Sequence, residues 1–144
     1  MCTVREILSK KDPWVASISP RASALEAATE MNRGKVGSLM VMDGERIVGI
    51  ITERDLLQRI LVEQRDAART SVEDVMTTEV LCCQLHTTID EARAVMKNRR
   101  VRHLPVVDDV GLHGVVSIGD LNAYEAHSQD VTIHVLTEYI HGRA

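Results

Sequence analysis

Short apolar runs recur along the chain in a pattern that occurs twice. Each run is rich in Val, Ile and Leu and is separated from the next by turn residues such as Asp43-Gly44. Short runs of β-branched residues flanked by turn signals predict buried strands. The predicted strands cover residues 15–18, 38–42, 47–51, 80–83, 103–107 and 112–116.

Helix-capping residues stand between the predicted strands at matching places in the two copies. Ser23 is followed three residues later by Glu26, and Thr88 is followed at the same distance by Glu91. A hydroxyl residue with Glu three positions on forms a capping box at the start of a helix, and Gly34 is a suitable helix terminator. The predicted helices cover residues 24–33, 53–65, 89–99 and 118–127.

The two copies align without a gap when the sequence is shifted by 65 residues, as the pairs Gly49/Gly114 and Asp55/Asp120 show. Each copy is a strand–helix–strand–strand–helix unit, which is too small to bury its sheet face and helix stripes alone. We therefore predict an α+β fold of two tandem βαββα repeats packed as a pseudo-two-fold module. The predicted parts are a first repeat at 1–66, a second repeat at 67–130 and a C-terminal amphipathic helix at 131–144.

Composition and charge exclude several classes of protein. Aromatic residues make up 2% of the chain and its net charge is -4, which argues against the stacking platforms and basic surfaces that bind nucleic acids. The adjacent Cys82 and Cys83 indicate reduced thiols rather than a disulfide framework. No apolar stretch has the length that a membrane span or signal peptide needs. We expect a soluble, cytoplasmic protein that binds neither membranes nor nucleic acids.

One motif that combines a hydroxyl with a carboxylate repeats where a strand is followed by a helix. Thr52 is followed three residues later by Asp55, and Ser117 is followed at the same distance by Asp120. A purely structural interpretation is that each pair is a capping box. The same geometry also suits a nucleoside phosphate, because a helix N-terminus favours an anion and a carboxylate can accept hydrogen bonds from both hydroxyls of a ribose. The duplication of the motif favours a binding site.

These residues resemble the CBS-domain family over essentially the whole chain. The resemblance rests on the 65-residue repeat, on Gly49-Ile-Ile-Thr52-Glu-Arg-Asp55 and Gly114-Val-Val-Ser117-Ile-Gly-Asp120, and on Arg102-His-Leu-Pro-Val106. The chain is most similar to short, stand-alone CBS pairs, which form a Bateman module with two clefts, commonly bind AMP, ADP, ATP or NAD, and often dimerise. The resemblance implies a non-catalytic regulatory module that binds an adenosine nucleotide and senses energy or redox state.

The resemblance also implies two nucleotide sites. In one of them Asp120 holds the ribose, Ser117 lies near ribose or phosphate, and Arg102 and His103 face the phosphates. In the other, Asp55 and Thr52 have the same roles. The residues implied around the adenine are Trp14, Val15 and Ala16 for the Asp120 site, and Glu79, Val80 and Leu81 for the Asp55 site.

The two implied sites differ in charge. Gly37 and Ser38 occupy the positions in the first copy that match Arg102 and His103, and they bring no cation. Arg54 is a candidate to compensate for this absence. We therefore expect the Asp120 site to prefer phosphate-rich ligands, while occupancy of the Asp55 site and the identity of the nucleotide stay open.

The alternative hypothesis is a structural dimerisation protein whose nucleotide sites are vestigial. The predicted helix 53–65 carries an apolar stripe that, with its counterpart near Leu121, favours a homodimer. An enzyme would need a nucleophile, a metal set or a catalytic dyad, and the sequence offers none; His134 and His141 lack the carboxylate or Cys that would complete a zinc site. The stripe consists of Leu56, Leu57, Ile60 and Leu61.

Overall fold

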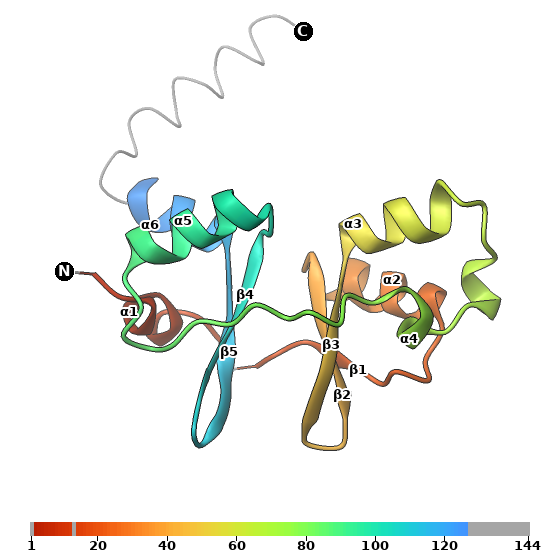
Figure 1. Cartoon of the computed structure of the whole chain (residues 1–144), viewed down its shortest axis with the longest axis horizontal. Coiled ribbons are helices and arrows are strands. Elements are labelled where there is room, and N and C mark those ends of the chain that lie inside the picture. Colours follow the sequence, from red (N-terminus) through yellow and green to blue (C-terminus); the bar gives the residue numbers. More distant parts are fainter. Residues whose placement is uncertain (1, 13, 127–144) are drawn as a thin grey trace, which may run out of the picture. The chain divides into compact units, whose positions relative to one another are not determined.

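The computed structural model describes residues 2–12 and 14–126, which form two compact units. The first unit is Trp14–Leu81, and the second unit joins the described residues of 1–13 to those from Cys82 onward. Both units mix helices with a small sheet (Figure 1), which confirms the α+β class and the tandem repeats. The predicted C-terminal helix at 131–144 lies outside the described residues.

The first unit contains a three-stranded sheet in the order β1-β2-β3, with β1 parallel to β2 and β2 antiparallel to β3. The turn between β2 and β3 places Gly44 at φ 66, a left-handed conformation that glycine adopts without strain. The elements are β1 (Ser17–Ile18), α2 (Ala24–Gly34), β2 (Ser38–Asp43), β3 (Arg46–Thr52), α3 (Glu53–Leu56), a π-helical turn η1 (Leu57–Leu61), a short 3₁₀ helix η2 (Ala67–Arg69) and α4 (Val72–Val75).

Helix α2 begins where the sequence predicted and packs by one face on the sheet. The Ser23 side chain accepts a hydrogen bond from the Glu26 N–H, which satisfies one free donor at the helix start. The helix ends after Gly34, although the left-handed capping residue is Lys35 rather than a glycine. The core of this unit consists of the buried residues Ala24, Ala27, Met31, Leu39, Val41, Ile51, Ile60, Val72 and Val75.

The second unit repeats this plan with a shorter sheet. Strands β4 (His103–Asp108) and β5 (Gly111–Ser117) form an antiparallel pair, flanked by α5 (Ile89–Arg99) and α6 (Ile118–Ala126). Residues Thr88 and Glu91 form the predicted capping box of α5. The buried apolar residues include Ile89, Ala92, Met96, Leu104, Val106, Val116 and Leu121.

The predicted strand 80–83 is reduced to a single parallel bridge between Cys83 and Val106. The reason lies in the partner strand. In the first unit, the N–H of Met40 donates to Ala16 and holds the incoming strand. The matching position of the second unit is Pro105, which has no N–H to donate.

Each unit is completed by a short helix that precedes the other repeat in the sequence. Helix α1 (Val4–Ser9), which the sequence analysis did not predict, docks on the second unit. The N–H of Val4 donates to the Thr87 carbonyl at 2.8 Å. Helix α4 docks in the same way on the first unit, where the N–H of Val72 donates to Ala22 at 2.8 Å. The compact units therefore do not follow the order of the sequence, because the apolar side chains of these helices are buried in the other half. The division into repeats at 1–66 and 67–130 stays a prediction.

The predicted helix 53–65 is the element that differs most from expectation. It starts at Glu53 as predicted but changes to a π-helical turn at Leu57 and ends at Leu61. Gln64 then adopts a left-handed φ of 55, which stops any continuation.

Candidate functional site

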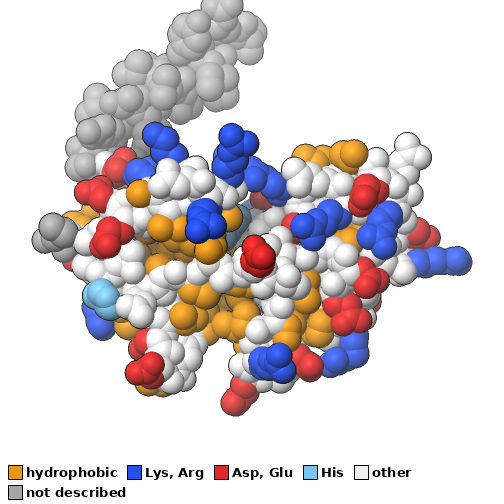
Figure 2. Space-filling view, in the orientation of Figure 1, with side chains coloured by type: hydrophobic (Ala, Val, Ile, Leu, Met, Phe, Trp, Pro, Cys, Tyr) orange, Lys and Arg blue, Asp and Glu red, His pale blue; other side chains and the backbone are white. Residues whose placement is uncertain are grey.

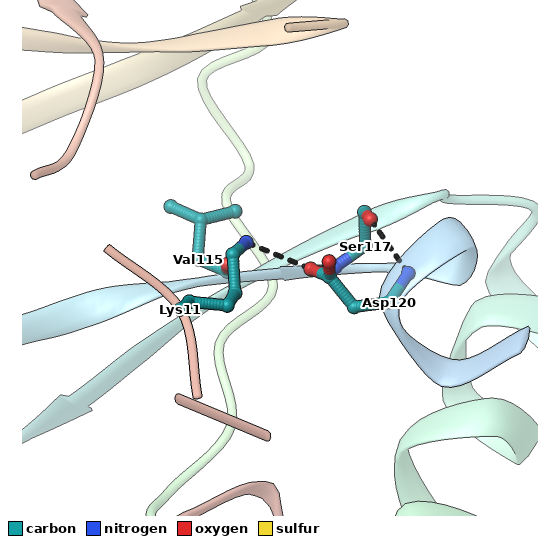
Figure 3. Close-up of polar contacts among 4 residues, drawn as sticks. All are labelled: Lys11, Val115, Ser117 and Asp120. Carbon is teal, nitrogen blue, oxygen red and sulfur yellow. Dashed lines mark hydrogen bonds and ion pairs between the residues drawn. The ribbon is translucent and has the colours of Figure 1, made fainter. Parts of the chain in front are cut away.

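The predicted pair Ser117 and Asp120 lies where β5 is followed by α6 in the second unit (Figure 3). The Asp120 N–H donates to Ser117 Oγ at 3.1 Å, and the Ser117 N–H donates to Asp120 Oδ2 at 2.9 Å. This reciprocal pair is the capping geometry predicted from the spacing. It fixes the carboxylate beside the first turn of α6 and leaves the side chain 23% exposed.

A residue that the sequence analysis did not single out contacts this carboxylate. The Nζ atom of Lys11, from the segment that follows α1, lies 2.7 Å from Asp120 Oδ2 and donates to the Val115 carbonyl at 2.8 Å. The Lys11 side chain is 38% exposed. The docking of α1 on the second unit thus brings a cation to the predicted site.

Arg102 and His103 lie next to Ser117 in the same unit. The N–H of Ile118, the first residue of α6, donates to the Arg102 carbonyl at 2.8 Å. His103 is the register partner of Ser117 across the β4–β5 pair. The structure therefore brings these two predicted residues together with Ser117 at one end of the β4–β5 pair, while their roles toward a nucleotide stay predictions.

The matching pair in the first unit, Thr52 and Asp55, is more enclosed. Asp55 is only 5% exposed. Its Oδ2 accepts hydrogen bonds from the Thr52 N–H at 3.0 Å and from the Thr52 hydroxyl at 3.2 Å, and its Oδ1 accepts one from the Thr77 hydroxyl at 3.0 Å. Both carboxylate oxygens are therefore engaged within the protein. For Asp55, the structural interpretation of the motif accounts for the contacts observed.

The predicted neighbours of Thr52 also gather at this end of the sheet. The N–H of Glu53 donates to the Gly37 carbonyl at 3.1 Å, and Ser38 is the register partner of Thr52. A hollow of about 510 Å³ opens between α2 and the start of α3, and of the predicted site residues only Gly37 lines it. Its lining residues are Ala28, Met31, Asn32, Lys35, Val36, Gly37, Glu53 and Leu56.

The remaining predicted site residues all belong to the first unit. Trp14 is 62% exposed, and the Ala16 carbonyl accepts a hydrogen bond from Met40 in β2. The grouping of Trp14, Val15 and Ala16 with Asp120, which lies in the second unit, stays a prediction. The residues concerned are Trp14, Val15, Ala16, Arg54, Glu79, Val80 and Leu81.

Sequence reasoning missed Lys11 and Thr77, the two side chains that contact the carboxylates from other segments. Both follow the exchanged helices, and these helices share a weak signature: Val4 and Val72 each precede an acidic residue by two positions. The signature lies three residues out of step with the 65-residue repeat, so a gapless alignment does not reveal it. A comparison that allowed this shift would have paired the two segments.

Other reactive groups of the described residues have ordinary structural roles. Cys82 is exposed and Cys83 is buried, as expected for neighbours on an extended segment. Partial desolvation of the sulfur raises the pKa of the Cys82 thiol although the residue as a whole is exposed. Burial, together with the nearby Cys82 thiol, raises the pKa of Cys83 to about 11, so both thiols are protonated at neutral pH. Within residues 2–12 and 14–126, no group of three or more His, Cys, Asp or Glu side chains is placed to hold a metal ion.

No helix in the described part of the chain combines the length and the apolar character needed to cross a membrane.

Two segments of the chain, residues 4–62 and 72–127, match the family model of the CBS domain.

Similar proteins are known in bacteria, archaea and plants. The chain is 36% identical to the CBS domain-containing protein CBSX3, mitochondrial, of Arabidopsis thaliana, over 81% of this chain and 59% of the plant protein. The structure resembles that of a candidate signal-transduction protein with CBS domains from Burkholderia ambifaria, with a TM-score of 0.85 and 35% identity over 88% of this chain and 96% of that one. It also resembles CBS domain protein PAE2072 from Pyrobaculum aerophilum complexed with AMP, with a TM-score of 0.72 and 25% identity over 82% and 88% of the two chains.

Proposed function

Because the chain belongs to the CBS-domain family, we propose that it is a non-catalytic regulatory module that binds an adenosine nucleotide at Asp120. One relative of similar structure is complexed with AMP, which supports this class of ligand. We further propose that occupancy of the site reports energy or redox state to a partner protein. A ligand can do so only if it binds two conformations of the module with different affinities.

The observation that carries this proposal is the environment of Asp120. Its carboxylate is partly exposed and fixed by the Ser117 N–H, and it lies beside the ammonium group of Lys11. A carboxylate in this position can accept hydrogen bonds from ribose hydroxyls, and the start of α6 and the nearby cation favour a phosphate. Asp55 lacks this freedom, because both of its oxygens already accept hydrogen bonds.

Titration calorimetry with AMP, ADP, ATP and NAD tests the proposal. We expect at least one of them to bind, and we expect Asp120→Ala to weaken that binding by about tenfold or more, the order of a lost hydrogen bond to a charged group. Asp55→Ala is the matched control, because it removes the same side chain from the equivalent motif. Binding that is unaffected by Asp120→Ala, or affected more by Asp55→Ala, would refute the choice of site.

A second candidate function, dimerisation, is supported by apolar side chains on η1 and the residue after it. Leu57, Leu61 and Val62 are 54%, 68% and 69% exposed. Figure 2 shows hydrophobic atoms along the upper edge of the first unit, where the helix formed by α3 and η1 runs in Figure 1. Of the predicted stripe, Leu56 and Ile60 instead pack on the core of their own unit. Leu121, the predicted counterpart in the second unit, is fully buried.

The chain thus has an exposed apolar surface next to a buried one on the same helix. We propose that Leu57, Leu61 and Val62 contact a second copy of the chain. Light scattering should report a dimer for the wild type and a smaller species for Leu61→Glu, while Gln58→Glu, on an exposed position of the same helix, should leave the mass unchanged. A monomeric wild type at high micromolar concentration would refute the homodimer.

A further inference from the structure

The pair formed by Lys11 and Asp120 has hydrogen-bonding capacity on both sides that the described residues do not use. A lysine ammonium group has three donors. Two of them are directed at Asp120 Oδ2 and the Val115 carbonyl, which leaves one N–H without a partner among the described residues. Asp120 Oδ1 likewise accepts no hydrogen bond from any other described residue. An acceptor and a cationic donor are therefore available side by side.

We propose that Lys11 is a specificity-determining residue, which makes the Asp120 site select phosphorylated nucleosides over uncharged ones. This inference rests on the proposed function and adds to it the residue that recognises the charge. The free Oδ1 accepts a ribose hydroxyl, and the third N–H of Lys11 donates to an anionic oxygen of the same ligand. The lysine stem is long and flexible, so its ammonium group can turn toward a phosphate while remaining close to the Val115 carbonyl.

Charge balance gives a second reason for this assignment. A lone Asp120 carboxylate would repel a phosphate held a few ångströms away. With the Lys11 ammonium group 2.7 Å from the carboxylate, the pair is neutral as a whole, and an incoming anion meets a cation on one side. An uncharged nucleoside gains nothing from the ammonium group, because it has no anionic oxygen to accept the third N–H of Lys11.

A purely structural role for Lys11 makes a different prediction. If Lys11 only fastened the segment after α1 to β5 and α6, its loss would affect every ligand of the site equally. The ratio of the affinities for AMP and adenosine separates the two roles, because both ligands carry the same ribose and base and differ only in the phosphate. This ratio is insensitive to a uniform loss of protein stability.

The experiment is titration of the full chain with AMP and with adenosine, using the wild type, Lys11→Met, Lys11→Arg and Lys10→Met. Lys11→Met keeps the length of the side chain and removes its charge, whereas Lys11→Arg keeps the charge. Lys10→Met is the matched control, because the Nζ of Lys10 lies 5.9 Å from the centre of the Tyr124 ring rather than at Asp120. Thermal melts of each variant establish that it is folded.

We expect Lys11→Met to weaken AMP binding about tenfold, the order of one charge-assisted hydrogen bond at a partly exposed site, and to change adenosine binding less than twofold. Lys11→Arg should keep most of the preference for AMP, and Lys10→Met should keep all of it. Equal losses for AMP and adenosine, or no loss for AMP, would overturn the role of Lys11 while leaving the nucleotide site intact. A wild type that binds neither of these ligands, nor ADP, ATP or NAD, would instead overturn the proposed function and this inference with it.

Discussion

The exchange of short helices between the two halves of the sequence can be tested at Val4. This residue lies in α1, is fully buried, and donates its N–H to Thr87 in the second unit. Sequence order alone would place α1 with the first repeat. Removing the Val4 side chain should therefore destabilise the second unit and leave the stability of the first unit, which follows α1 directly in sequence, unchanged.

The size of the effect follows from the buried methyl groups. Val4→Ala removes two of them, which costs about 1.6 kcal/mol in transfer free energy at about 0.8 kcal/mol each. The space left behind adds roughly 1 kcal/mol, because the surrounding structure relaxes only in part. We expect the free energy of unfolding to fall by about 2–3 kcal/mol. Domains typically have a free energy of unfolding of about 5–15 kcal/mol, so most would stay folded after this loss.

Urea denaturation measures the total loss, and hydrogen exchange locates it. In Val4→Ala, amide protection should fall in α5, β4 and β5 and remain near the wild-type level in α2, β2 and β3. Val72→Ala is the mirror experiment, since Val72 is equally buried and donates to Ala22 of the first unit. Arg5→Ala, on an exposed position of α1, should change stability by no more than about 0.5 kcal/mol.

A loss of protection in Val4→Ala that falls mainly in α2, β2 and β3 would refute the docking of α1 on the second unit. Equal losses of stability in Val4→Ala and Arg5→Ala would refute it as well, because burial of the Val4 side chain would then contribute nothing to stability.

Two further predictions concern a tight backbone approach and a titrating pair. A methyl group added at Gly49 would lie 2.7 Å from Met76 Sδ and 2.8 Å from the Thr77 carbonyl, so Gly49→Ala should cost about 1–3 kcal/mol in urea denaturation; Gly114→Ala should cost less, because the added methyl meets only the flexible side chain of Leu8 at 3.0 Å. The hydrogen bond from His113 lowers the pKa of Asp108 below its ordinary value of 3.8, so His113→Ala should raise that pKa in an NMR titration. The pKa of Asp108 is lower in the folded state than in the unfolded state. The stabilisation from this hydrogen bond is therefore fully present above the unfolded-state pKa and is lost as the pH falls through the folded-state pKa. The stability difference between wild type and His113→Ala should therefore shrink below about pH 4, and an unchanged Asp108 pKa would contradict this account.

The repeated elements could be predicted from the sequence because their signals are local. Ser23 and Thr88 cap α2 and α5 as expected, and the apolar runs around the Asp43-Gly44 turn form β2 and β3. The third strand of the second unit could not be predicted in the same way. Whether residues near Cys83 form a strand depends on the donors of the partner strand, where Pro105 has none.

Of the candidate site, only the contacts between residues of the same local motif could be predicted from the sequence. The spacing of Ser117 and Asp120 fixes their reciprocal hydrogen bonds, but it contains no information about Lys11, which lies more than 100 residues away in sequence. The same holds for Thr77 and Asp55. In both units the side chain that distinguishes one carboxylate from the other comes from an exchanged segment, and only the tertiary structure brings it there.

The docking of α1 also sets an order of events during translation. Val4 and Ile7 are synthesised before the residues beyond Cys82 that form the surface burying them. The chain of the unit Trp14–Leu81 is complete before that surface exists, so α1 has no surface to dock on until the residues beyond Cys82 are made. A chain that ends near residue 81 should therefore leave Val4 and Ile7 of α1 unburied, and chaperones that bind exposed apolar residues would recognise it.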